Sequence, residues 1–212
     1  MFDMLSVFER KNPLGAVEAF KLAFGGSSRC HLIVKVNNAH LRPLHFRNLL
    51  LTSAGYPITV LDRVMERNEV NALIACCDCL VSLHRSEGFG LPLAEGMYLG
   101  KPVIATAYGG NMDFTRPENS FLVSYKLQPP GKRAEHYNKR CLWAEPSIYH
   151  AAELMKTVFE EAGLRAEVAR AGQTFVRSHH SPAAVGRLIR QRLEDLLETR
   201  LPGHEGPHAS CG

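Results

Sequence analysis

The chain has 212 residues, which is enough for one large domain or for one domain with a tail. Hydrophobic residues make up 45% and charged residues 22%, the ordinary proportions of a globular domain with a core. The net charge of +4 suits a small anionic ligand or an acidic membrane face, but it is too weak to indicate nucleic acid binding.

No run of about 18 apolar residues is present, so no membrane-spanning helix is expected. Residues 1–5 lack the basic and apolar stretches of a signal peptide. These features predict a cytoplasmic protein, with a peripheral position at the inner face of a membrane as the alternative. Six cysteines are then expected to be reduced thiols: Cys30, Cys76, Cys77, Cys79, Cys141 and Cys211. A CxxC spacing occurs once without a second ligand pair, so we interpret it as a helix end leading into a buried strand.

Strands and helices are expected to alternate along residues 2–125. The apolar runs predict strands at 2–8, 31–36, 58–61, 79–83, 102–106 and 121–125, the last of the series. Helical spacing predicts helices at 13–24, 43–54, 68–76 and 91–99, with Asn12 and Asn68 as caps. This order favours a Rossmann-like α/β fold with an open, mainly parallel sheet. After a polar stretch at 126–140, additional C-terminal helices are expected at 148–161, 164–178 and 182–199. Residues 1–200 would form one domain, and residues 201–212 a disordered tail.

Open α/β sheets bind ligands beyond the carboxyl ends of their strands, which draws attention to the loop after residues 79–83. Gly88 and Gly90 let backbone amides approach a ligand without a Cβ in the way. Pro92 marks the first turn of the next helix, so the amides of Phe89, Gly90 and Leu91 are expected to be unpaired donors. A helix N-terminus of this kind favours phosphate.

Two carboxylates, Glu87 and Glu95, flank this helix entrance and can accept hydrogen bonds from hydroxyl pairs. A nucleotide sugar, with a diphosphate between two hydroxylated rings, satisfies both demands. The alternative stays open that Glu95 only complements the helix dipole and that Glu87 is a solvated loop acid. Arg10 and Lys11 follow the first strand at the same edge and could neutralise phosphates, or they could be an exposed basic pair. Lys35 is a weaker candidate, and His84 and Arg85 are expected to be structural or solvent-facing.

The segments 87–95 (EGFGLPLAE), 100–105 (GKPVIA) and 109–110 (GG) resemble the C-terminal domain of retaining GT-B glycosyltransferases of family 4. The mark of that family is a pair of glutamates around a Gly-Phe-Gly loop. Residues 143–146 (WAEP) also resemble a bacterial polysaccharide-type branch. The resemblance covers residues 2–125 and, more loosely, the helices up to residue 199.

The resemblance implies a role for each matching position. Glu95 would hold the ribose hydroxyls, Glu87 would contact the donor sugar, and Lys11 would neutralise the diphosphate. The sugar and the distal phosphate would be held by the loop and its backbone amides, at Gly88, Phe89, Gly90 and Leu91. The base would be contacted, through the backbone, by a loop at residues 63–65 that includes Val64 and Met65. Asp113, after Gly-Gly, would be structural. Family members commonly carry an arginine at the position of Ser6, so Arg10 is expected to supply that charge.

The implied reaction transfers a sugar from a UDP- or GDP-sugar to a hydroxyl of a glycan or lipid-linked acceptor, with retention. Glu87 and Lys11 are the expected catalytic residues; no cofactor and no metal are expected, and no Asp-x-Asp motif is present. The acceptor-binding N-terminal domain of the family is not recognised, so we expect a missing domain or a partner chain, and no transfer by the isolated chain. Two alternatives stay open: an orphan nucleotide-sugar-binding module, and a phosphorylase-like or epimerase-like relative.

Overall fold

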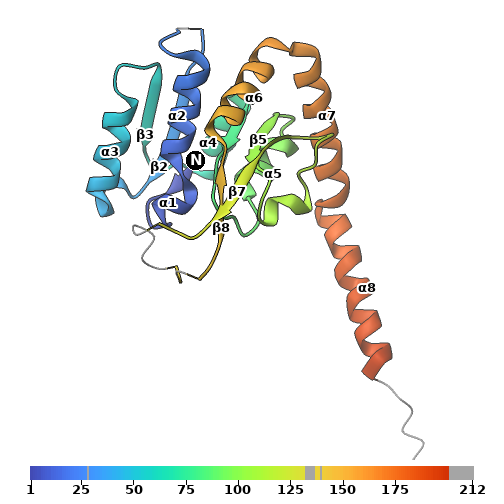
Figure 1. Ribbon diagram of the computed structural model, residues 1–212. Helices are drawn as coiled ribbons and strands as arrows, with labels where there is room; N and C mark the ends of the chain where they lie inside the picture. The colour runs from blue at the N-terminus through green and yellow to red at the C-terminus, as the bar shows by residue number, and fades with distance from the viewer. Residues whose placement is uncertain (28, 132–136, 139, 201–212) are drawn as a thin grey trace, which may run out of the picture.

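A computed structural model describes residues 1–27, 29–131, 137–138 and 140–200 (Figure 1). The tail predicted at 201–212 and part of the polar stretch at 126–140 lie outside the described residues. None of the helices in the described ranges is long and apolar enough to span a membrane.

Six strands form two separate parallel sheets of three strands each. The first has the order β1-β2-β3, with β1 (Phe2–Asp3), β2 (Leu32–Asn37) and β3 (Ile58–Asp62). The second has the order β4-β5-β6, with β4 (Leu80–Ser82), β5 (Val103–Thr106) and β6 (Phe121–Val123). The predicted α/β class with parallel strands is confirmed, but one continuous sheet is not formed.

Three details of the sequence-based prediction are wrong. The first strand was expected to reach residue 8, but the chain turns after Asp3, whose carboxylate accepts the amide of Leu5 at 2.8 Å. The helix expected to start at Asn68 starts one residue earlier after Glu66, whose amide donates to the Glu69 carboxylate at 2.9 Å. The strand at 121–125 is not the last, because β7 (Tyr125–Gln128) and β8 (Trp143–Pro146) follow as an antiparallel pair.

Helices connect the strands and extend the chain beyond them. The described helices are α1 (Phe8–Lys11), α2 (Pro13–Phe24), α3 (Pro43–Ser53), α4 (Arg67–Cys76), α5 (Leu91–Tyr98), α6 (Ile148–Glu160), α7 (Ala162–His179) and α8 (Pro182–Arg200), with 3-10 turns at Ala39–Leu41 and Gly110–Asp113. The three predicted C-terminal helices are confirmed, and α8 projects away from the rest of the fold (Figure 1).

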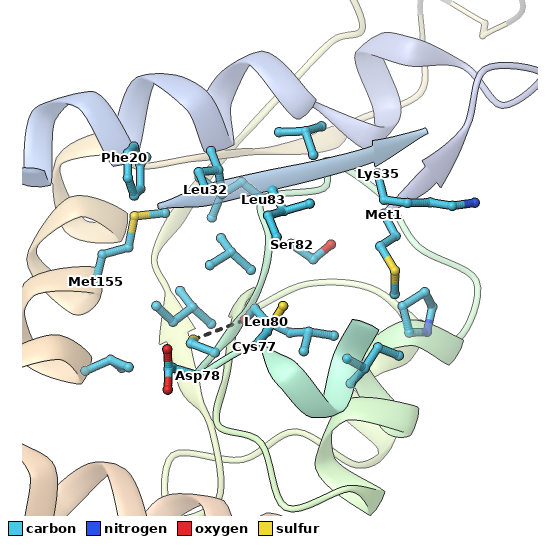
Figure 2. A pocket seen from close by; sticks show the side chains of 18 of the residues that line it. Met1, Phe20, Leu32, Lys35, Cys77, Asp78, Leu80, Ser82, Leu83 and Met155 are labelled. Carbon is cyan, nitrogen blue, oxygen red and sulfur yellow. Dashed lines mark hydrogen bonds between the residues drawn. The ribbon is translucent and has the colours of Figure 1, made fainter. Parts of the chain in front are cut away.

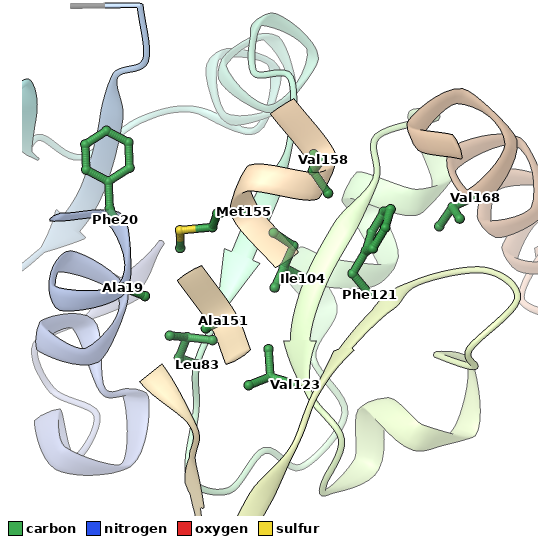
Figure 3. Packing of buried hydrophobic residues seen from close by; sticks show 10 residues of the cluster. All are labelled: Ala19, Phe20, Leu83, Ile104, Phe121, Val123, Ala151, Met155, Val158 and Val168. Carbon is green, nitrogen blue, oxygen red and sulfur yellow. The ribbon is translucent and has the colours of Figure 1, made fainter. Parts of the chain in front are cut away.

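The main hydrophobic core joins the two sheets through α2 and α6. Ala19 and Phe20 of α2 lie in one cluster with Ala151 and Met155 of α6 (Figure 3). The same cluster includes Ile104 of β5, the central strand of the second sheet. Smaller clusters pack α2 and α3 on β2, and α5 and α7 on β5. The two sheets are therefore held together by helices and not by strand pairing.

Asn12 fixes the start of α2 against the end of β4. Its backbone is left-handed with φ +50°, and its Oδ1 accepts the amide of Gly15 at 3.2 Å, as predicted for a helix cap. Its Nδ2 donates to the carbonyl of Leu83 at 2.8 Å. The residue before it, Lys11, is thereby held next to the loop that follows Leu83.

Candidate functional site

Arg85 ties the loop after β4 to two distant parts of the chain. Its amide donates to the carbonyl of Arg10 at 2.8 Å, and its Nη1 donates to the carbonyl of Glu9 at 2.6 Å. Its Nε and Nη2 form a bidentate pair with the Glu145 carboxylate of β8, at 2.5 and 2.7 Å. The start of the loop is thus held between α1 and β8, and of the two roles expected for Arg85, structural or solvent-facing, its contacts match the structural one.

His84 lies fully buried under the loop and organises it through three neighbours. Its Nε2 lies 2.9 Å from the carbonyl of Tyr108 and 3.1 Å from Oδ1 of Asn111, two acceptors, so this nitrogen carries the proton. Its Nδ1 then accepts from the hydroxyl of Ser82 at 2.9 Å. Burial lowers the pKa of His84 more than its hydrogen bonds and the charge of Glu87 raise it, so the ring is neutral at pH 7. Of the two roles expected for His84, structural or solvent-facing, its burial matches the structural one.

Gly109 and Gly110 pack directly on the backbone of the loop. The amide of Gly110 donates to the carbonyl of Glu87 at 2.8 Å. A Cβ on Gly110 would lie 1.8 Å from the carbonyl oxygen of Gly88, and one on Gly109, where φ is +99°, would lie 2.8 Å from that of Glu87. Only glycine fits at these two positions, and the close backbone contact fixes the position of the loop relative to the sheet.

Lys11, Arg10 and Glu87 form a half-buried charge cluster at the mouth of the loop. Lys11 Nζ donates to Glu87 Oε2 at 2.5 Å, and Arg10 Nη1 lies 3.9 Å from Oε1 of the same carboxylate. Burial raises the pKa of Glu87. The hydrogen bond and charge of Lys11, together with the charges of Arg10 and His84, lower it by a larger amount, so the pKa lies below its usual range. Two cations and one anion leave one net positive charge, which suits an anionic ligand.

The N-terminus of α5 presents free amides beside this cluster. Gly90 precedes the helix with φ +94°, and no side chain caps it. Among the described residues, no partner accepts from the amides of Phe89, Gly90 and Leu91. The ring of Phe89 packs on Phe114, with centroids 5.1 Å apart, which anchors the loop. The entrance of α5 thus has the free amides that the sequence predicts, and their binding of an anion stays a prediction.

Glu95 lies in a different hollow from Glu87. It pairs with Arg67 of α4, whose Nη1 is 2.5 Å from its Oε1, and the two side chains are 26% and 68% exposed. The hollow has a volume of about 580 Å³ and is lined by Phe89 and Leu91 as well as by this pair. Glu87 instead lines the cavity between the two sheets. The two glutamates flank the entrance of α5, as expected, but they lie in two separate hollows on either side of it.

The remaining candidate residues belong neither to the charge cluster nor to the entrance of α5. Val64 is 77% exposed, and neither it nor Met65 lines either hollow. Lys35 is buried in β2, donates to Asn37 and lines the same cavity as Lys11 and Glu87. Asp113 is exposed at the end of the 3-10 turn. In the part of the chain that the structure describes, no group of three or more His, Cys, Asp or Glu residues is placed to hold a metal ion.

Sequence reasoning missed Arg67 and the network around Asn111. Arg67 opens α4 at the carboxyl edge of β3, so its position in the first turn after a strand was a usable signal. Asn111 donates to Thr106 and Thr115 while it faces His84, and it is fully buried. Nothing in the sequence alone distinguishes this buried asparagine from a loop residue.

The comparison with protein families decides the identity of the chain. A model described as glycosyl transferases group 1 matches residues 52–175, more than half of the chain. The chain belongs to the group 1 glycosyl transferases. The match includes both glutamates, the helix entrance and the Gly-Gly turn, the parts of the sequence that carried the resemblance.

Individual proteins are similar to this chain over different lengths. Human alpha-1,3/1,6-mannosyltransferase ALG2 is 25% identical over 213 residues, which cover 92% of this chain and 46% of ALG2. A trehalose synthase of Pyrococcus horikoshii is 38% identical over 71 residues, 32% of this chain and 17% of that enzyme. The chain thus spans less than half of the length of these relatives.

Solved structures give the same picture of the fold. Anabaena Alr3699/HepE in complex with UDP and glucose has a TM-score of 0.67 at 17% identity, covering 92% of this chain and 47% of that one. The C-terminal domain of a group 1 glycosyl transferase (LpcC) from Francisella tularensis has a TM-score of 0.62 at 18% identity, covering 86% and 84%. This group 1 chain therefore has the fold of the C-terminal half of a GT-B glycosyltransferase.

Proposed function

We propose that this chain is the donor-binding half of a retaining glycosyltransferase that uses a nucleoside diphosphate sugar. The observation that carries the proposal is the joint position of Lys11, Glu87 and the free amides at the α5 entrance. The HepE structure, a fold relative, holds UDP and glucose, which supports this class of donor. The sugar would be transferred to a hydroxyl of a glycan or lipid-linked acceptor, in polysaccharide or glycoconjugate synthesis.

The diphosphate would lie at the α5 entrance, where the amides of Phe89, Gly90 and Leu91 donate to its oxygens. Lys11 is bound to Glu87, so a bound diphosphate would replace part of this contact. Glu87 is then freed to accept hydrogen bonds from the donor sugar. Lys11 would stabilise the negative charge that builds on the leaving nucleoside diphosphate, without a metal ion.

The nucleoside would lie in the hollow beside α5. Glu95 would accept the ribose hydroxyls, and Arg67 would move away from that carboxylate, which its 68% exposure allows. Leu91 and Tyr98 supply apolar surface in the same hollow. The base would reach the backbone of the loop that carries Val64 and Met65.

Transfer would need the acceptor-binding half, since the chain spans less than half of the length of ALG2 and of the HepE chain. Glu87 is the nearest carboxylate to the expected sugar position, and it would orient the anomeric carbon. An orphan binding module would show the same donor binding but no transfer after the chain is joined to an acceptor-binding domain.

Calorimetric titration with UDP and GDP tests the proposal. We expect one of them to bind, and we expect Lys11→Ala to weaken that binding ten- to a hundredfold, since a charge-assisted hydrogen bond contributes about 1.5–3 kcal/mol. Lys156→Ala, which removes an equal charge from an exposed position of α6, is the matched control and should bind normally. Binding of neither nucleotide by the folded chain would contradict the proposal.

A further inference from the structure

Helix α3 is apolar on the side that faces solvent as well as on the side that faces the sheet. Leu49 is fully buried, and Phe46 packs on the same hydrophobic cluster. On the outer side, Leu44 is 80% and Leu51 65% exposed, and their spacing of seven positions equals about two turns, which puts both on one face. Leu41, just before the helix, is also about half exposed. A surface helix normally turns polar residues to water, so this apolar outer face indicates a binding surface.

The same face carries positive charge and has no acidic side chain of its own. Residues 19–61 contain no aspartate or glutamate. Arg42 and Arg47 are exposed, and neither guanidinium forms a hydrogen bond or ion pair with another of the described residues. In the described part of the chain, the only ion pair of α3 joins His45 to Glu9 of α1 at 3.5 Å. The two arginines are therefore available to an anionic partner.

The C-terminal end of α3 extends this face. Tyr56 is 40% exposed, and the Lys21 ammonium of α2 lies 4.3 Å from the centre of its ring while it donates to the carbonyl of Thr52. Tyrosine and long cationic side chains have an apolar body and a polar end, which suits them to a boundary between water and lipid. The surface, called the α3 face below, consists of Leu41, Arg42, Leu44, Arg47, Leu51 and Tyr56.

The shape of the α3 face favours a broad surface over a single anchoring side chain as its partner. Neither the cavity of about 690 Å³ between the two sheets (Figure 2) nor the hollow beside α5 is lined by a residue of α3. Helix α3 forms one end of the molecule in Figure 1, opposite α8. The strongest contacts between proteins are usually side chains seated in pockets, whereas the α3 face projects its leucines outwards.

A second copy of the chain does not match the charge of this face. In a two-fold dimer the same surface meets itself, so Arg42 and Arg47 would face the same two arginines. Like charges that meet across an interface are unfavourable, and α3 has no carboxylate to separate them. A membrane with anionic lipids offers what both residue types need, because it has negative phosphates above an apolar layer.

We propose that the α3 face binds peripherally to a membrane that contains anionic lipids. Helix α3 lies in the plane of the membrane, and Leu44 and Leu51 insert at the boundary between headgroups and acyl chains. Arg42 and Arg47 bind lipid phosphates, while their aliphatic stems lie along the apolar layer. This proposal rests on the α3 face alone and does not depend on the proposed function.

Co-sedimentation of the chain with lipid vesicles tests the proposal. Vesicles of phosphatidylcholine are compared with vesicles in which about one lipid in three is phosphatidylglycerol. The chain should bind the anionic vesicles about tenfold more tightly, because each arginine near an anionic surface strengthens binding. Added salt should weaken this binding, because it screens the attraction between arginine and phosphate.

Helix α8 provides matched controls, because it also exposes leucines and arginines but has Glu194 and Asp195 among them. Each helix receives one double variant that removes leucines and one that removes arginines: Leu44→Gln with Leu51→Gln and Arg42→Gln with Arg47→Gln at α3, Leu188→Gln with Leu193→Gln and Arg187→Gln with Arg190→Gln at α8. Both α3 variants should lose about nine-tenths of the vesicle-bound fraction, because apolar insertion and attraction to anionic lipids act together. Both α8 variants should bind vesicles like the parent. Since all these side chains are exposed, the four variants should keep the melting temperature of the parent.

Absence of vesicle binding, equal binding to neutral and anionic vesicles, or an equal loss of binding in the α3 and α8 variants would overturn the proposal. So would a dimer, measured by analytical ultracentrifugation, that dissociates in the Leu44→Gln, Leu51→Gln variant, because it would assign the α3 face to a second copy. Titration with UDP and GDP keeps the two proposals apart. The α3 variants should bind nucleotide like the parent, so a parent that binds vesicles but no nucleotide contradicts the donor-binding proposal alone.

Discussion

The two glutamates that flank α5 sit in very different surroundings. Glu87 is held by Lys11 and Arg10, and its backbone is pressed against Gly110, so three distant segments meet at this residue. Glu95 lies on one face of α5 with a single, largely exposed partner, Arg67. The difference shows that the Glu87 side of the helix entrance is fixed by packing, whereas the Glu95 side is a surface whose side chains a ligand can displace.

The largest expected effect comes from the contact beneath Glu87. Gly110→Ala places a Cβ 1.8 Å from the carbonyl oxygen of Gly88, a main-chain atom that cannot move aside cheaply. We expect the free energy of unfolding, measured by urea denaturation, to fall by about 3 kcal/mol or more. Gly163→Ala meets no atom within 4 Å and should leave stability unchanged or raise it by up to about 1 kcal/mol. Equal stability of the two variants would show that the loop is not packed on the Gly-Gly turn.

Acid should destabilise the Glu87 side of the helix entrance before the Glu95 side, because the buried His84 lies beneath the loop that carries Glu87. Its pKa is lowered by burial in the folded protein, so the unfolded chain binds the proton first as the pH falls below about 6.5. Stability attributable to His84 is therefore complete above that pH and is lost on acidification towards its folded pKa. Urea midpoints at pH 7.5 and 5.5 should show this loss.

The controls for the acid effect are two histidine variants. His84→Gln should flatten the pH dependence, at the cost of a lower midpoint at neutral pH. His40→Gln, at an exposed position, should keep the dependence of the parent chain. A parent chain whose midpoint is the same at both pH values would exclude His84 as a buried neutral support of the loop.

Local patterns predicted much of this architecture, and the failures have physical causes. The helix at Pro13–Phe24 and its cap Asn12 follow from short-range geometry, as does the α5 entrance with Gly90 and Pro92. The extent of β1 and the division into two sheets depend on pairing between distant strands, which apolar runs do not encode. The same limit applies to the site: spacing placed Glu87 and Glu95 on either side of the helix entrance, but only packing against Lys11 and Arg67 shows that they face separate hollows.

The smallest expected effect concerns the exposed side of the comparison. Arg67→Ala removes a surface ion pair, which typically contributes no more than about 1 kcal/mol, so urea denaturation should barely change. Lys11→Ala leaves the half-buried carboxylate of Glu87 without its main donor and should lower the free energy of unfolding by about 1–3 kcal/mol. For nucleotide binding the two variants should also differ, because Arg67→Ala frees Glu95 for ribose hydroxyls and should bind UDP or GDP at least as tightly as the parent. If Arg67→Ala were as destabilising as Lys11→Ala, the hollow at Glu95 would be as rigid as the cluster at Glu87, and a ligand could not open it by displacing one side chain.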